Sequence, residues 1–394
     1  MRGLRAVGVV ALLAALALVP ATPARAEVTC APAPASGQQI PGVPWPQARY
    51  DPKRLTGIAD GTGVTVAVID SGVDASHPQL AGSVLRGVDL LTSGGTGQRD
   101  CVGHGTAVAS IIAAGPVAGT DFAGLAPKVR ILPYRVTERE LVDGRPQGRD
   151  GPPGALARAV RDAADRAQVI NLSLAQDGDD PDLRAAVGYA LSRDVVVVAA
   201  VGNQHTTGTG TDGPSYPAGY PGVLGVGAID ATGTRLAQSQ VGRYVSVVAP
   251  GGDVVVAAPG QGLTRQSGTS FAAPFVSATA ALIRQYRPGL HADEIVARIL
   301  ATTDPAPGTR PDDGYGYGIL NPYRAVTDQL GPVRSAAAPR VPVRAAVIDH
   351  PATDPARGAA LGLAFGGVLL SGLIGVVATL LPRGAARRWR PGRL

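Results

Sequence analysis

Short runs of apolar, β-branched residues recur along the chain and alternate with stretches in which apolar residues follow a helical spacing. The run 63–69 is apolar at nearly every position, which is typical of a strand buried on both faces of a sheet. The predicted strands are 63–69, 129–136, 169–174, 195–201, 223–229 and 244–249, and the predicted helices include 154–167, 182–192 and 293–301. This alternation predicts an α/β fold, a doubly wound, mainly parallel sheet with helices on both faces.

The N-terminal end reads as an export signal rather than as part of the fold. Arg2 and Arg5 precede the apolar run 6–19, and a small-residue site, Ala24-Arg25-Ala26, follows. This layout predicts a secretory signal peptide over residues 1–26. Residues 27–58 are rich in Pro, Ala and Gly without sustained periodicity, so we expect an extended arm, followed by the folded domain at 59–330.

A second apolar segment lies near the other end. Residues 359–381 carry no charge, and as a helix they would span about 34 Å, enough for a hydrocarbon core of about 30 Å. A buried core helix is the alternative, but the segment is long, has no polar face and runs into a basic stretch. The pattern predicts a linker at 331–358, a single transmembrane helix at 359–381 and a basic cytoplasmic tail at 382–394, with the body of the protein outside the cell membrane.

Charge and cysteine content narrow the function further. The net charge is +6, but the arginines are scattered and no basic block with aromatic residues is present, so nucleic acid is not an expected partner. Cys30 and Cys101 form an even pair in an exported chain, which favours a disulfide. Histidines at zinc-ligand spacing and dense acidic loops are absent from the sequence, so we expect neither a metal nor another cofactor.

Four residues lie after predicted strands or at the start of predicted helices, where α/β folds place their catalytic residues. Asp70 ends the strand 63–69, His104 lies between two glycines before an apolar helix, and Asn203 follows the strand 195–201. Ser270 precedes the apolar run 271–283, as a residue in the first turn of a buried helix would. Taken singly, each has an ordinary structural explanation: a turn aspartate, a satisfied buried histidine, a strand-ending asparagine and a helix-capping serine. Together, in the order Asp, His, Asn, Ser along the chain, the four residues favour a catalytic site over these separate structural explanations.

In this order the chain resembles the subtilisin-type serine proteases. The resemblance covers about residues 61–325 and makes 59–330 a peptidase domain. It rests on four segments: 66–73 (VAVIDSGV), 104–109 (HGTAVA), 199–203 (AAVGN) and 267–274 (SGTSFAAP).

The resemblance implies the roles of these residues. Ser270 would be the nucleophile, His104 its base and Asp70 the acid that orients the imidazole, with cleavage through an acyl-enzyme. The Asn203 amide and the Ser270 N–H would hold the oxyanion. A decayed pseudoprotease is the alternative, but no catalytic position is substituted.

The family also implies where a peptide lies. An extended substrate would pair with the strand at Ser173, Leu174 and Ala175, beside Gly202, and with the segment after 134–136. Ala175 stands where relatives commonly have glycine, which restricts the wall of the primary specificity pocket.

The architecture around the domain resembles the mycosins, membrane-anchored proteases of type VII secretion systems. That resemblance implies limited proteolysis of a secretion substrate and association with secretion-complex subunits. The roughly 35 residues between the signal and the first strand are too few for an independently folded inhibitory prodomain, and a Cys30–Cys101 bridge would pin the arm beside the catalytic cleft. Two alternatives stay open: a structural subunit of the secretion complex whose proteolysis is secondary, and a broad nutritional protease, which the membrane tether disfavours.

Overall fold

The computed structural model describes residues 30, 35–142, 145–206, 208 and 210–331. The chain divides into two units, 1–335 and 336–394, and the second lies outside the described residues. The signal peptide predicted at 1–26, the transmembrane helix at 359–381, the basic tail and nearly all of the linker also lie outside them. Within the described ranges, no helix is long and apolar enough to cross a membrane.

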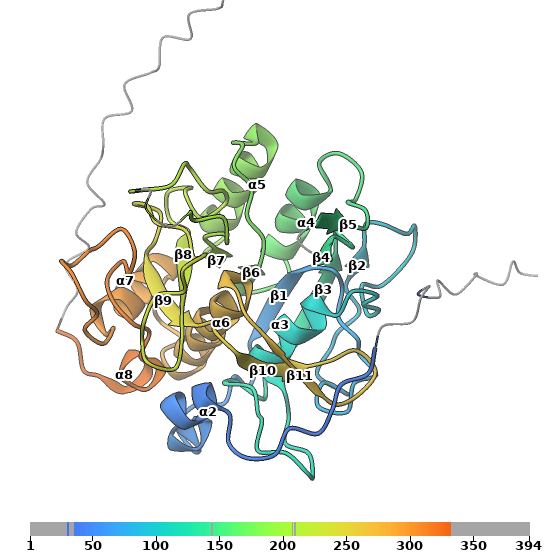
Figure 1. Cartoon of the computed structure of the whole chain (residues 1–394), viewed down its shortest axis with the longest axis horizontal. Helices are drawn as coiled ribbons and strands as arrows, with labels where there is room; N and C mark the ends of the chain where they lie inside the picture. The colour runs from blue at the N-terminus through green and yellow to red at the C-terminus, as the bar shows by residue number, and fades with distance from the viewer. Residues whose placement is uncertain (1–29, 31–34, 143–144, 207, 209, 332–394) are drawn as a thin grey trace, which may run out of the picture. The chain divides into compact units, whose positions relative to one another are not determined.

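A seven-stranded sheet forms the centre of the domain, and all of its neighbouring strands are parallel (Figure 1). The strand order is β2-β3-β1-β6-β7-β8-β9. Because parallel strands end at the same edge, the residues that follow β1, β6 and β7 lie near one another. The strands are β1 Thr65–Asp70, β2 Val88–Asp89, β3 Arg130–Arg135, β6 Val169–Leu172, β7 Val196–Ala200, β8 Leu224–Ile229 and β9 Val247–Pro250.

Helices cover both faces of this sheet, as the sequence predicts. On β1, Val66 and Val68 pack into a core with residues of α3 (His104–Ala113) and α6 (Thr269–Tyr286). The intervening Ala67 and Ile69 pack into a second core with residues of α4 (Ala155–Ala164) and α5 (Pro181–Ser192). Alternate side chains of a strand point to opposite faces, so a strand buried on both sides must be apolar throughout.

The arm is more structured than an extended segment. It contains the helix α2 (Trp45–Tyr50) and the short 3-10 helix η2 (Pro52–Leu55). Tyr50 and Leu55 are buried in the first core, and the Tyr50 ring meets Phe275 of α6 edge-on at 5.6 Å between centroids. The expectation of an extended arm is therefore wrong over residues 45–55, because these helices bury apolar side chains against α6.

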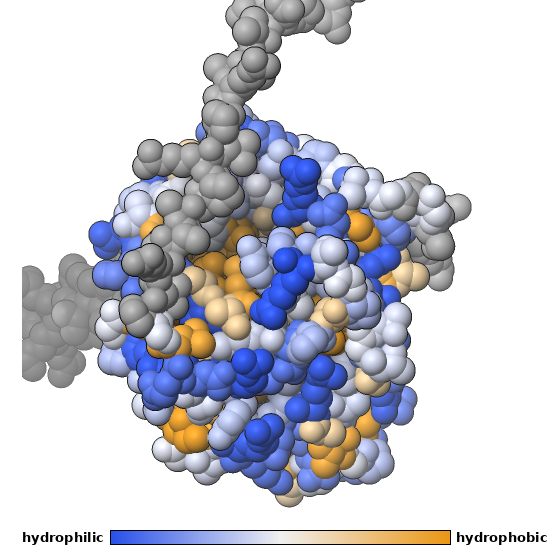
Figure 2. Space-filling model, turned by 90° about the vertical axis from the view of Figure 1, so that its left-hand side faces the viewer, coloured by the Kyte–Doolittle hydropathy of each residue, from blue (hydrophilic) through white to orange (hydrophobic). Residues whose placement is uncertain are grey.

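The remaining elements surround the sheet. The segment 137–153 contains the antiparallel pair β4 (Glu140–Val142) and β5 (Arg145–Gln147). A second antiparallel pair joins β10 (Val254–Ala257) to β11 (Leu263–Gln266), and α7 (Ala292–Ala301) and α8 (Pro322–Thr327) complete the domain. The side that Figure 2 shows is mostly hydrophilic, with apolar residues gathered in several separate patches.

Candidate active site

Asp70 and His104 meet at the C-terminal end of β1. His104 Nδ1 lies 2.7 Å from Asp70 Oδ1, which also accepts the Ser71 N–H at 2.7 Å. The Asp70 side chain is 3% exposed whereas the His104 side chain is 30% exposed, so the carboxylate is shielded from solvent and the imidazole is accessible to it. A carboxylate on Nδ1 favours the tautomer with its proton there, which leaves the lone pair of the neutral ring on Nε2.

The two glycines beside His104 make this approach possible. A Cβ on Gly105 would lie 2.0 Å from the Gly72 carbonyl oxygen and 3.1 Å from Asp70 Cβ. Gly103, the residue before the helix, has a φ of 94°, a conformation that favours glycine. The backbone therefore packs closely around the imidazole, and this packing sets the start of α3 directly against the turn after β1.

Asp100 is a buried carboxylate beneath the start of α3, and its importance escaped the sequence analysis. Its Oδ1 accepts hydrogen bonds from Ser71 Oγ at 2.9 Å and from the backbone N–H groups of Val102 and Gly103. Its Oδ2 accepts the N–H and the hydroxyl of Thr106 at 2.8 and 2.7 Å. Burial raises the pKa of Asp100 above its ordinary value. The available signal was an aspartate four residues before a helix-starting histidine, where it can cap the helix.

Ser270 lies in the first turn of α6 and is half-buried. The Thr269 N–H, one residue earlier, donates to Asn203 Oδ1 at 2.9 Å, which leaves the Nδ2 of that amide as a donor. Phe271, the residue after Ser270, has its ring against the His104 ring at 5.2 Å between centroids. The structure thus brings Asp70, His104, Asn203 and the start of α6 together at the C-terminal edge of the sheet, where the positive end of a helix dipole favours a developing negative charge.

Gly202 and Ala175 lie close together at the same edge. A Cβ on Gly202 would meet Gln240 Oε1 at 1.7 Å and Ala175 Cβ at 3.4 Å, and the φ of Gly202 is 98°. β6 ends at Leu172, so Ser173, Leu174 and Ala175 continue past the strand. Their exposure differs: Ser173 is buried, Leu174 is half-buried and Ala175 is exposed. The Ser173 side chain therefore points into the protein, and only the backbone of this residue suits the predicted peptide-binding role.

The segment after Val136 pairs with residues 149–151. The Val136 carbonyl accepts the Gly151 N–H at 2.8 Å, and the Glu138 N–H donates to the Arg149 carbonyl at 2.7 Å. Thr137 forms an antiparallel bridge with Asp150 between these two bonds. Because hydrogen bonds alternate along an antiparallel strand, the N–H and C=O of Thr137 point to the opposite edge, where an extended peptide could pair with them.

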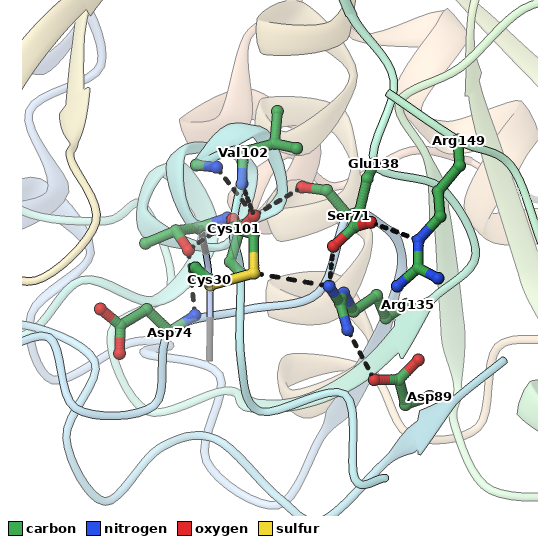
Figure 3. The surroundings of a disulfide bond; sticks show 12 residues. Cys30, Ser71, Asp74, Asp89, Cys101, Val102, Arg135, Glu138 and Arg149 are labelled. Atoms are coloured by element: carbon green, nitrogen blue, oxygen red, sulfur yellow. Dashed lines mark hydrogen bonds and ion pairs between the residues drawn. A yellow bond between two sulfur atoms is a disulfide. The ribbon is translucent and has the colours of Figure 1, made fainter. Parts of the chain in front are cut away.

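The disulfide between Cys30 and Cys101 is present, as predicted. Beside it lies the fully buried Arg135, whose Nη2 is 3.5 Å from Cys101 Sγ and also contacts Glu138 (Figure 3). Arg135 Nη1 pairs with Asp89 at 2.8 Å. Arg135 is the β3 partner of Asp70 in the sheet register, so the arm is fastened close to the acid. Sequence reasoning missed this buried arginine; the available signal was a charged residue at the end of a largely apolar strand.

In the part of the chain that the structure describes, no group of three or more His, Cys, Asp or Glu side chains could hold a metal ion. The polar groups at this site are instead a hydroxyl, an imidazole, carboxylates and an amide. Together they suit acyl transfer from a peptide to the hydroxyl.

Comparison with known proteins places this geometry in a family. The model of the subtilase family matches residues 61–318. Mycosin-4 of Mycobacterium tuberculosis is 37% identical, over 84% of this chain and 79% of its own length. The crystal structure of MycP1 from Mycobacterium smegmatis matches with a TM-score of 0.66 and 31% identity, covering 77% of this chain and 90% of that one.

A chain in the solved periplasmic assembly from the ESX-5 inner membrane complex also matches. Its TM-score is 0.65 at 32% identity, over 76% of this chain and 88% of that one. The family model, the sequence relatives and the solved structures all identify the same kind of protein. The chain belongs to the subtilase family and is a mycosin-type, subtilisin-like serine endopeptidase.

Proposed function

We propose that this protein is a membrane-anchored endopeptidase that carries out limited proteolysis of a type VII secretion substrate, with Asp70, His104 and Ser270 as its catalytic triad. The observation that carries the triad is the 2.7 Å contact between His104 Nδ1 and Asp70 Oδ1 at the edge where α6 presents Ser270. The contact orients a base whose other nitrogen can serve a hydroxyl.

The reaction follows from these groups. His104 Nε2 takes the proton of Ser270 Oγ as the oxygen attacks the scissile carbonyl, and Asp70 stabilises the imidazolium. The Asn203 Nδ2 and the Ser270 N–H donate to the oxyanion of the tetrahedral intermediate. On collapse, His104 returns the proton to the leaving amine and an acyl-enzyme forms. Water then attacks the acyl-enzyme with His104 again as base, which releases the acid and restores the hydroxyl.

A substrate would bind as an added strand. Its backbone would lie between the free edge of Thr137 and the segment 173–175, so main-chain hydrogen bonds give affinity. Ala175 lies beside Gly202, and its methyl group would narrow the pocket that the family resemblance places there for the side chain before the cleaved bond. We therefore expect small side chains at that position to be cleaved faster than large ones.

The cellular setting is part of the same proposal. The proposed topology places the catalytic domain outside the membrane and the tail in the cytoplasm. Its segments are the signal peptide at 1–26, the arm at 27–58, the peptidase domain at 59–330, the linker at 331–358, the span at 359–381 and the tail at 382–394. Similarity to mycosin-4 and to a chain of the ESX-5 assembly supports an association with secretion-complex subunits.

Labelling with a fluorophosphonate tests the chemistry directly. The full-length protein in mild detergent should be labelled, and Ser270→Ala should not be, while both keep the same melting temperature. Wild-type protein that folds but remains unlabelled would overturn the catalytic proposal.

A structural role in the secretion complex is the second candidate, favoured by the similarity to a chain within a solved membrane-complex assembly. Ser270→Ala in the producing cell separates the two functions. Secretion that persists without cleavage supports the structural role, whereas secretion lost from an intact complex supports proteolysis as the essential activity.

A further inference from the structure

Pro274 leaves the backbone carbonyl of Ser270 without its regular partner. Both residues lie in α6, and Pro274 is the only proline inside that helix. In an α-helix the N–H of one residue donates to the carbonyl four residues earlier, and proline has no N–H to donate. The carbonyl that loses its helical hydrogen bond is therefore that of Ser270.

Ser173 provides the missing donor from the sheet. Its hydroxyl donates to the Ser270 carbonyl oxygen at 2.7 Å and accepts a hydrogen bond from Asn171 Nδ2 at 2.9 Å. Asn171 Oδ1 in turn accepts the Ser277 hydroxyl at 2.8 Å. Ser277 and Asn171 are fully buried and Ser173 is 4% exposed. These three residues form a relay that leaves α6 at Ser277, crosses the end of β6 and returns to α6 at Ser270.

The relay also has a fixed direction. Ser277 donates to the amide oxygen of Asn171, which turns the amide nitrogen toward Ser173. The Ser173 oxygen accepts from that nitrogen, so its single proton is available for the Ser270 carbonyl. Each member thus sets the orientation of the next, and a buried network of this kind holds its members more rigidly than a single contact would.

Ser270 is consequently held from both sides. The residue before it is fixed by Asn203 Oδ1, which accepts the Thr269 N–H at 2.9 Å, and its own carbonyl is fixed by Ser173 at 2.7 Å. The first anchor comes from the end of β7 and the second from the end of β6. The first turn of a helix is otherwise the part most prone to fraying.

We propose that Ser173 is a positioning residue for the nucleophile, acting through the Ser270 carbonyl and supported by Asn171 and Ser277. The inference rests on the proposed role of Ser270 and deepens it. The relay fixes the backbone that carries the Ser270 hydroxyl, and its side chains do not contact the substrate. Reacting atoms must be held within a fraction of an ångström, and a displacement of about 1 Å can cost about a hundredfold in rate.

The test compares serine variants of the full-length protein by the kinetics of fluorophosphonate labelling. Ser173→Ala should lower the maximal labelling rate about ten- to hundredfold, because the nucleophile is displaced. The probe concentration for half-maximal rate and the midpoint of the pH–rate profile should stay unchanged, because neither pocket nor base is altered. Ser173→Thr keeps the hydroxyl and should restore most of the rate.

A matched control separates positioning from general destabilisation. Ser110 is also buried, and its hydroxyl accepts the Ala257 N–H away from the relay. Ser110→Ala should lower the melting temperature without changing the labelling rate. Ser277→Ala, at the far end of the relay, should lower the rate by about three- to tenfold and serves if Ser173→Ala does not fold.

The outcomes are distinguishable. Wild-type protein that is not labelled at all overturns the nucleophile and the positioning role together. An active wild type with a Ser173→Ala rate within about twofold of it overturns the positioning role alone, as does a Ser173→Thr variant as slow as Ser173→Ala. An unchanged Ser277→Ala rate would remove the relay from the proposal.

Discussion

Asn203 Oδ1 accepts the backbone N–H of Thr269 at 2.9 Å, directly before Ser270. The bond joins the loop after β7 to the first turn of α6, 66 residues later in the chain. Because the amide oxygen is occupied by this donor, the amide nitrogen must point the other way. One contact thus aligns the helix and aims the donor that the proposed oxyanion requires.

Loss of that donor should slow the chemistry and leave binding almost intact. We expect Asn203→Ala to reduce kcat by about 10²–10³, a magnitude borrowed from the corresponding asparagine of subtilisin, with little change in KM. Steady-state cleavage of a peptide p-nitroanilide would measure both constants. A reduced kcat/KM that comes only from a higher KM would contradict the oxyanion role.

Gly105 should not tolerate even a methyl group. Its Cβ would lie 2.0 Å from the Gly72 carbonyl oxygen, so Gly105→Ala must move α3 away from β1 and separate His104 from Asp70. We expect a loss of about 2–3 kcal/mol of unfolding free energy and at least about a hundredfold loss of activity. Urea unfolding and fluorophosphonate labelling would measure the two effects.

Gly188 is the matched control for that substitution. It lies inside α5, and a Cβ there would meet nothing within 4 Å. Gly188→Ala should therefore raise the unfolding free energy by about 0.5–1 kcal/mol and leave activity unchanged, because alanine favours a helix interior. Equal effects of the two substitutions on stability and activity would show that packing at Gly105 is not what holds His104 against Asp70.

Asp74 should stabilise the protein in a pH-dependent way. Burial works to raise its pKa, but hydrogen bonds from Ser76 and from the Gly260 N–H outweigh burial and hold the pKa below its ordinary value of 3.8. A carboxyl with a lowered pKa in the folded state stabilises fully above its unfolded pKa, and this stabilisation disappears as the pH falls through the folded value.

Asp74→Ala should accordingly lose about 1 kcal/mol of unfolding free energy at pH 7 and progressively less as the pH falls below 3.8. Denaturant titrations of wild type and variant at several pH values would follow the difference. A difference that is constant with pH would show that the contribution of Asp74 does not come from its charged form.

The disulfide should contribute stability more than regulation. Cys30 and Cys101 are 71 residues apart in sequence, and closing a loop of this size restricts the unfolded chain. Cys30→Ser should therefore lower the free energy of unfolding by about 2–4 kcal/mol, and a reducing agent should lower the melting temperature of the wild type to about that of the variant. Labelling at 25 °C should stay unchanged; a clear increase would instead show that the tethered arm restrains the active site.

Much of the fold and of the candidate site could be predicted because the relevant signals are local. A strand buried on both faces must be apolar throughout, so runs such as 63–69 could be recognised without knowing their neighbours. Glycines around His104 and small residues before Ser270 likewise indicate close backbone approach at those positions. Their order along the chain then indicated a nucleophile, a base, an acid and an amide.

The sequence by itself determined the type of sheet, the family and the order of the candidate catalytic residues, because each is written in short contiguous segments. Only the tertiary structure decided that the Ser71 hydroxyl donates to Asp100, that Arg135 lies beside the disulfide, and that the Ser173 hydroxyl turns inward to the Ser270 carbonyl. The second half of the arm folds for the same kind of reason, because Tyr50 packs on Phe275. These contacts depend on partners up to 225 residues away, and no local pattern specifies which distant group will complete a hydrogen bond or a core.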